Sequence, residues 1–296
     1  MSAPTPTVRA LLRRSVDYAG LFPPAALSMR GAAEHYATHL RSPEAWMLAR
    51  FVVPVERLDE LALAAGPLVG EAGPWRLSAL LGGNAASDGA RIREFNTAQR
   101  GRFVVDVVEC RATDVGSVRR VVGELPGELR SFVELPQLDD SRAMLEAIGA
   151  AGAWAKVRTG GVTPDAFPPA RQVAALIAHA AEVRVPFKAT AGLHHPLTGE
   201  YPATYDADAP RATMFGFLNM LAAAVFALRG TPESRLVELL EERDPSMLRI
   251  DAEMLGWRGL SATAEQIASA RASRFVAFGS CSFAEPVEGL RSMRLL

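Results

Sequence analysis

Lysine and cysteine are both scarce in this chain of 296 residues. The two cysteines, Cys110 and Cys281, lie far apart in the sequence, which argues against a disulfide scaffold and fits a reducing compartment. Among 32 basic residues only Lys156 and Lys188 are lysine. Arginine stays charged at any reachable pH, whereas a buried lysine can lose its proton. We therefore expect the two lysines to stand where amine chemistry is needed.

The sequence also lacks the features that bind nucleic acids or membranes. The net charge of −1 leaves no basic excess for nucleic acid or an anionic membrane. Residues 1–14 have no apolar core of signal-peptide type, and the longest apolar stretch, Met214 to Leu228, is too short to span a bilayer comfortably. We expect a cytoplasmic protein with no membrane or nucleic-acid partner. We also expect the apolar stretch to be a buried helix or the interface of a homo-oligomer.

Apolar runs of strand length alternate with amphipathic helical segments along the whole chain. Such alternation implies right-handed crossovers and a parallel sheet, and about eight units predict a single (β/α)₈ barrel domain over residues 1–296. A doubly wound open sheet is the alternative, weakened by the lack of a G-x-G-x-x-G turn. We expect a long loop at 196–213 after the seventh strand and extra helices at 231–259. The predicted strands are 15–21, 48–55, 76–81, 103–110, 130–135, 154–158, 187–192 and 275–280.

Charged side chains interrupt several of these strands. Counting alternate residues places Lys156 and Arg158 on one face of the sixth strand, and Lys188 on the matching face of the seventh. On the same reasoning Asp106 shares a face with Cys110. A charge is least costly at the mouth of a barrel, so Asp106, Glu134, Lys156, Arg158 and Lys188 are expected to converge there. Two close ammonium groups would leave one amine neutral and nucleophilic. The alternative is a buried ion-pair network, Lys156 with Glu134 and Lys188 with Asp106.

Four short runs in this region resemble class I aldolases of the deoxyribose-phosphate aldolase type. They are Asp106-Val107-Val108, Lys156-Val157-Arg158-Thr159-Gly160, Lys188-Ala189-Thr190-Ala191-Gly192 and Gly279-Ser280-Cys281-Ser282. The resemblance implies a barrel in which Lys156 forms a Schiff base and Lys188 tunes it. The chain departs from the family at His194-His195-Pro196, at Phe283-Ala284 and at its end, where a tyrosine is missing. These departures weaken the phosphate site.

The leading hypothesis is therefore an aldolase-like lyase acting on a small carbonyl substrate, with no cofactor and no metal ion. Arg158 suits a substrate carboxylate and points to an anionic substrate. The expected catalytic residues are Lys156, Lys188, Asp106 and Glu134. The expected substrate-binding residues are Arg158, Thr159, Thr190, Gly192, His194, His195, Gly279 and Ser280.

Two alternatives remain open. One is a metal-assisted barrel enzyme of the enolase or sugar-isomerase kind, in which Asp106, Glu134 and a histidine hold a divalent ion and the lysines act as bases. The other is a ligand-binding barrel without catalysis. Its signature would be two lysines locked in salt bridges with no open cavity above them.

Overall fold

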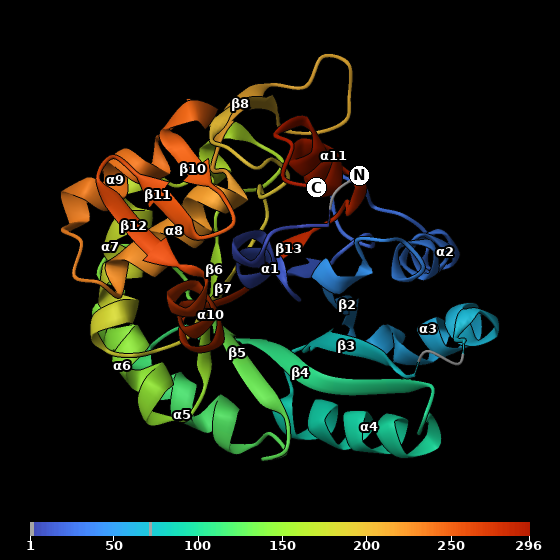
Figure 1. Ribbon diagram of the computed structural model, residues 1–296. Helices are drawn as coiled ribbons and strands as arrows, with labels where there is room; N and C mark the ends of the chain where they lie inside the picture. Colours follow the sequence, from blue (N-terminus) through green and yellow to red (C-terminus); the bar gives the residue numbers. More distant parts are fainter. Residues whose placement is uncertain (1–2, 71–72) are drawn as a thin grey trace.

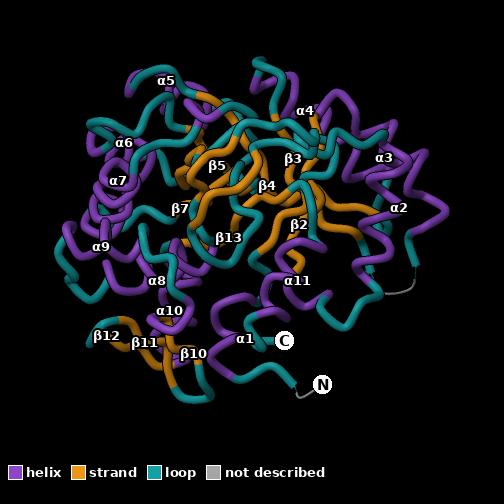
Figure 2. Tube along the Cα trace, turned by 90° about the horizontal axis from the view of Figure 1, so that it is seen from above, coloured by secondary structure: helices purple, strands orange, loops and turns teal. Residues whose placement is uncertain are grey.

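Eight parallel strands close into a barrel in the computed structural model, which describes residues 3–70 and 73–296 (Figures 1 and 2). The order around the barrel is β1-β13-β7-β6-β5-β4-β3-β2. The predicted (β/α)₈ barrel is confirmed, since each predicted strand falls on a barrel strand. The strands are β1 Val16–Tyr18, β2 Leu48–Pro54, β3 Trp75–Leu80, β4 Phe103–Arg111, β5 Arg130–Glu134, β6 Trp154–Arg158, β7 Phe187–Thr190 and β13 Phe275–Ser280.

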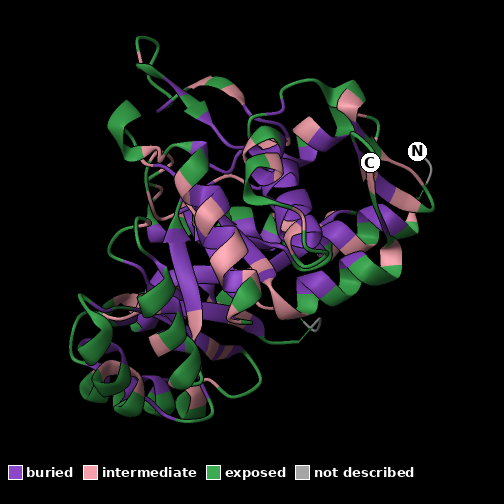
Figure 3. Ribbon diagram, turned by 90° about the vertical axis from the view of Figure 1, so that its left-hand side faces the viewer, coloured by how far each residue is buried: buried purple, intermediate pink, exposed green. Residues whose placement is uncertain are grey.

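Helices cover the outside of the barrel, and each buries one face against it (Figure 3). In α7, Val173, Ile177 and Ala180 are buried at a spacing of about one helical turn. Side chains cap several helix starts, as Thr263 and Gln266 do reciprocally for α10. The helices around the barrel are α1 Pro6–Leu12, α2 Met29–Leu40, α3 Leu58–Ala65, α4 Ala85–Ala98, α5 Val115–Gly123, α6 Arg142–Ala150, α7 Ala170–Glu182, α10 Ala264–Ser273 and α11 Ala284–Ser292.

The predicted loop at 196–213 contains a small hairpin, β8 Gly199–Pro202 paired with β9 Arg211–Met214. The segment expected to be helical at 231–259 holds one α-helix, α9 Glu233–Leu240, and one turn of 3-10 helix at Pro245–Met247, followed by strands. These are β10 Leu248–Ile250, β11 Met254–Trp257 and β12 Leu260–Thr263, which form an antiparallel sheet. The helical prediction is wrong there because Arg258 and Gly259 both have positive φ, 39° and 84°, as a tight two-residue hairpin turn requires.

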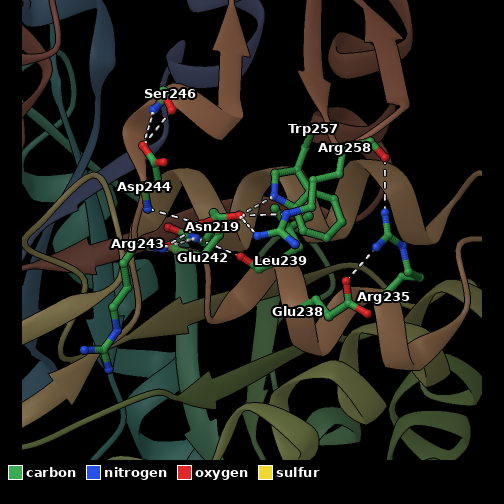
Figure 4. A network of polar contacts seen from close by, with 10 residues as sticks. All are labelled: Asn219, Arg235, Glu238, Leu239, Glu242, Arg243, Asp244, Ser246, Trp257 and Arg258. Atoms are coloured by element: carbon green, nitrogen blue, oxygen red, sulfur yellow. Dashed lines mark hydrogen bonds and ion pairs between the residues drawn. The ribbon is translucent and has the colours of Figure 1, made fainter.

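The apolar stretch forms α8 Phe217–Ala227, whose residues 217–226 are all buried within the chain. Asn219 on this helix accepts from the backbone N–H of Thr198 at 3.1 Å and donates to the carbonyl oxygens of Leu239 and Glu242 at 2.8 and 2.9 Å. Glu242 in turn accepts from Trp257 Nε1 at 3.2 Å (Figure 4). The helix is therefore covered by α9 and the small sheet, and its burial needs no second subunit.

No helix in the described ranges is both long and apolar enough to cross a membrane.

Candidate active site

A cavity of about 410 Å³ opens at the carboxyl ends of the barrel strands. Glu109 and Lys156 reach it from β4 and β6, and Arg158 lines it from the end of β6. Most of the remaining wall is apolar, so charged groups that face the cavity interact more strongly than they would in water. The apolar wall includes Ala19, Phe22, Pro23, Val52, Leu80 and Met214.

The two lysines share one carboxylate. Lys156 Nζ lies 2.9 Å from Glu109 Oε2 and 2.7 Å from Glu134 Oε2. Lys188 Nζ lies 2.7 Å from Glu109 Oε1 and donates a second, short hydrogen bond to Asp17 Oδ2. The Ser78 hydroxyl also donates to Glu109, at 2.7 Å. The lysines are direct neighbours in the register of β6 and β7, and Glu109 bridges them from across the barrel.

Asp106 does not belong to this network, and its prediction as an active-site residue is wrong. It pairs with Arg50 at 2.6 Å and with Arg76. The reason is a bulge in β4: Leu77 pairs with Val105 and Ser78 with Val107, so Asp106 is an extra residue without a partner on β3. Simple alternation fails beyond that point, and Glu109 faces the lysines. The alternative ion pair of Lys188 with Asp106 is wrong as well, because Asp17 and Glu109 hold Lys188.

Glu109 was missed because the alternation was counted through the bulge. The sequence did contain a signal, since a carboxylate near the carboxyl end of an apolar barrel strand is costly to bury without a purpose. Asp17, at the centre of β1, is a further member that the strand pattern did not single out. It lies 2 % exposed in the barrel interior, which supports its place in the site.

The network fixes the charges of its members. Burial raises the pKa of Glu109, but Lys156 and Lys188 lower it by more, so the pKa lies well below its usual range. Burial lowers the pKa of Lys188, but Asp17 and Glu109 raise it by more, and the net shift is upward. The expectation that two close amines leave one neutral is therefore wrong for Lys188. The carboxylate between the amines offsets their repulsion.

The two lysines differ in their access to the cavity. The side chain of Lys188 is 0 % exposed and does not line the cavity, whereas that of Lys156 is 8 % exposed and forms part of the floor. Both are held by carboxylates, as in the non-catalytic alternative, but the open cavity above Lys156 is the feature which that alternative lacks. Glu134 contacts Lys156 but does not line the cavity.

Six of the eight predicted substrate-binding residues line the cavity: Arg158, Thr190, Gly192, His194, His195 and Gly279. The other two do not. The Thr159 hydroxyl donates to the Ala191 carbonyl at 2.8 Å, and that of Ser280 donates to the Ser282 carbonyl at 2.6 Å. Both hydroxyls hold the loops that form the rim, so these residues position the site rather than line it.

The turn after β7 brings the backbone close to the cavity. Ala191 and Gly192 both have positive φ, 68° and 77°. A Cβ on Gly192 would lie 2.7 Å from the ring of Phe167. Glycine is required there, and the strained Ala191 is the kind of backbone feature that persists where the surroundings hold it, often at functional sites.

A second polar group lies at the rim of the cavity. His194 Nδ1 lies 2.6 Å from Glu285 Oε2, and Cys281 Sγ lies 3.9 Å from His194 Nε2. Burial alone would lower the pKa of His194, but its contacts with Cys281 and Glu285 raise it to about 9. The imidazole is therefore protonated at neutral pH and can donate a proton into the cavity.

The pKa of His195 is shifted in the opposite direction from that of His194. Burial, and then the charge of His194, lower its pKa to about 4. Its ring stacks on Tyr201 with centroids 3.5 Å apart. Adjacent residues of an extended strand point in opposite directions, but both histidines line the cavity because β7 ends at Thr190, before them.

The ligands proposed for the metal-assisted alternative are separated. Asp106 is bound to arginines, Glu134 to Lys156, and His194 to Glu285. Within residues 3–70 and 73–296, no group of three or more histidine, cysteine or acidic side chains is arranged to hold a metal ion. The set named for that alternative therefore does not form a site.

No protein-family model matches this sequence, and no curated protein matches it. Among solved structures, the chain is similar to a dihydrodipicolinate synthase from Oceanobacillus iheyensis. The identity is 13 %, the similarity covers 78 % of each chain, and the TM-score is 0.40. A similarity at this level does not bear on activity, so the functional argument depends on the geometry of the site.

Proposed function

We propose that the chain is a Schiff-base-forming lyase of the class I aldolase kind, in which Lys156 attacks a small carbonyl substrate. One observation carries the proposal: Lys156 Nζ lies at the floor of an open cavity at the carboxyl ends of the strands, between two carboxylates. Active sites of (β/α)₈ enzymes lie at this end of the barrel. The order of Lys156 and Lys188 on β6 and β7 also agrees with the aldolase resemblance of their sequence runs.

The two carboxylates have different roles in this proposal. Lys188 holds Glu109 ionised, so Glu109 is a poor acceptor for a proton. Glu134 has Lys156 as its close partner and takes one proton from the ammonium, which leaves a neutral amine. The amine nitrogen forms a bond to the carbonyl carbon, and one of its protons passes to the oxygen. The resulting hydroxyl leaves as water when Glu134 returns its proton.

The product of these steps is a protonated imine, so the site keeps the positive charge that the ammonium had. Glu109 already lies 2.9 Å from the nitrogen and stabilises that charge without rearrangement. Lys188 and Asp17 keep Glu109 in place from the side away from the cavity. In this proposal Lys188 positions Glu109. The aldolase resemblance of the sequence implies a different role, in which Lys188 tunes the reactivity of Lys156.

The charged residues at the rim of the cavity favour one class of substrate. Arg158 presents a guanidinium to the cavity, which favours a carboxylate or another anionic group on the substrate. The protonated His194 faces the same space and supplies a proton to the carbon of the enamine that forms when the carbon–carbon bond beside the imine breaks. We propose a small anionic oxo-acid or aldehyde as the substrate.

Borohydride trapping tests the proposal. The chain has only two lysines, so an adduct is simple to assign by intact mass and peptide mapping. Incubation with a panel of 2-oxo acids and aldehydes, followed by reduction, is expected to label Lys156. Lys156→Arg keeps a cation beside Glu109 and Glu134 but cannot form the imine, so it should show only the background labelling of the N-terminal amine.

Labelling of Lys188 instead of Lys156, or equal labelling of the wild type and Lys156→Arg, would contradict the proposal. An absence of any adduct over the whole panel, in folded protein, would do so too. Circular dichroism of both proteins confirms that the comparison is between folded molecules.

A further inference from the structure

A second cavity, of about 750 Å³, lies at the opposite end of the barrel, where the strands begin. Its wall includes the first residues of β5 and β6 and parts of α1 and α10, two helices that pack against each other (Figure 1). Arginine dominates its polar lining. Six arginines line the cavity: Arg9, Arg13, Arg14, Arg50, Arg130 and Arg271.

Most of these arginines have no acidic partner. Arg50 is paired with Asp106, which leaves five of the six. None of those five lies within 4.0 Å of a carboxylate in residues 3–70 and 73–296. The one carboxylate in the lining, Asp17, is bound to Lys188. The cavity therefore holds an excess of positive charge although the whole chain is close to neutral.

Neighbouring groups fix the directions of several guanidinium groups. Arg130 lies 3.9 Å above the ring of Trp154, and Arg9 lies 5.1 Å above that of Trp46. Arg271 is 9 % exposed and donates to the Arg13 carbonyl at 3.3 Å and to the carbonyl of Phe275. These three arginines are thus held by stacking and backbone contacts rather than by acidic side chains.

Arg271 is the buried member of the five arginines that lack an acidic partner. Its Nε has no hydrogen-bond partner in the described part of the chain, although it is buried. Burial lowers the pKa of this arginine to about 10, which reflects the cost of an unpaired buried charge. Arg14 adds a local strain, since it holds φ at 50° while its N–H bonds to the Trp46 carbonyl at 2.9 Å.

We propose that this cavity binds a polyphosphate group. Guanidinium groups pair with phosphate through two parallel hydrogen bonds, and clustered arginines suit a ligand with several adjacent negative charges. The volume is within the range of small-molecule sites, about 300–1,000 Å³. A ligand of this class would pair the arginines that lack a carboxylate and relieve their mutual repulsion.

Recognition depends on the phosphates and not on an attached base. The two indoles in the lining each already stack on a guanidinium. Inorganic tripolyphosphate, ATP and GTP should therefore bind with similar affinity, whereas sulfate, with fewer charges, should bind much more weakly.

Isothermal titration of the whole protein at fixed ionic strength tests the proposal. Tripolyphosphate is expected to bind at one site per chain, and Arg130→Gln and Arg13→Gln should each weaken binding at least tenfold. Arg119→Gln is the matched control, since Arg119 is an exposed arginine on α5 with no acidic partner within 4.0 Å in the described residues. It should bind as the wild type does.

Equal loss of affinity in Arg119→Gln would show general charge attraction and overturn the proposal. An absence of saturation by tripolyphosphate at millimolar concentration would overturn it too, and a strong preference for one nucleotide over tripolyphosphate would refute recognition by the phosphates. Lys156→Arg should bind tripolyphosphate normally, so this result is separate from the outcome of the imine test.

Discussion

Adjacent residues of one type have opposite properties in this protein because their partners differ. His194 contacts Glu285 and Cys281 and has a raised pKa, whereas His195 stacks on Tyr201 and has a lowered one. Lys156 and Lys188 share Glu109, yet only Lys156 reaches the cavity. Residue type alone therefore identifies the candidates, and the contacts assign the roles.

The raised pKa of His194 predicts a stability component that is lost in alkali. Its pKa is about 9 in the folded chain, against about 6.5 when unfolded, so protonation stabilises the fold. The contribution is fully present below pH 6.5 and disappears as the pH rises through 9. It is on the order of 3 kcal/mol. Replacement by glutamine should remove it, measured as the difference between urea unfolding free energies at pH 6 and pH 10.

His35→Gln is the control, since His35 is exposed on α2. It should leave the dependence between pH 6 and pH 10 as in the wild type. If His194→Gln keeps the same alkaline loss as the wild type, the ion pair with Glu285 does not stabilise the fold.

At the scale of elements, the sequence predicts the barrel strands well and their inward faces less well. Mainly apolar runs mark β2, β4 and β13 clearly, because strands covered on both faces carry few polar residues. The bulge at Asp106 leaves no mark in that pattern, since it depends on how β4 pairs with β3. One extra residue changed the predicted carboxylate from Glu109 to Asp106. Residues on regular strands, Lys156 and Lys188, were placed correctly.

The insertion between β7 and β13 depends on a few buried polar contacts. Asn219 on α8 uses its side-chain amide for three hydrogen bonds, to the Thr198 N–H and to the carbonyls of Leu239 and Glu242. Asn219→Leu keeps the number and branching of the side-chain heavy atoms but leaves buried backbone groups without partners, each costing about 1–3 kcal/mol. We expect the free energy of unfolding to fall by at least about 2 kcal/mol, measured by urea denaturation.

Arg243→Ala tests the same region with an exposed contact. Arg243 pairs with Glu200 at 3.3 Å, and both side chains are about half exposed. Its loss should cost less than about 1 kcal/mol. Equal effects of the two substitutions would mean that the buried contacts of Asn219 do not hold the insertion together.

At the scale of the whole molecule, the two ends of the barrel differ in charge. Carboxylates surround the lysines in the interior and at the carboxyl ends of the strands, while arginines without acidic partners gather where the strands begin. A net charge of −1 hides this separation. The sequence could not predict the arginine cavity, because its members come from α1 and the turn after it, and from β2, β5 and α10, and meet only when the barrel closes.

Lys188 links opposite sides of the barrel, and this makes its contribution to stability measurable. It lies between Asp17 on β1 and Glu109 on β4. Lys188→Met leaves the buried Asp17 without a cation and should cost about 3–5 kcal/mol. Asp17→Asn leaves Lys188 with Glu109 and should cost less. The double variant removes both charges, so its cost should fall below the sum of the single costs by about 1–3 kcal/mol.

The exposed pair Arg142 and Glu182, 2.6 Å apart, provides the control cycle, with an expected coupling below about 1 kcal/mol. Urea unfolding at pH 7 gives all values. Additive effects of Asp17→Asn and Lys188→Met would mean that the two charges are stabilised independently of each other. A coupling well above that of the surface pair would mean that closure of the barrel depends on this interior pair, and that the carboxylate facing Lys156 is held by the fold itself.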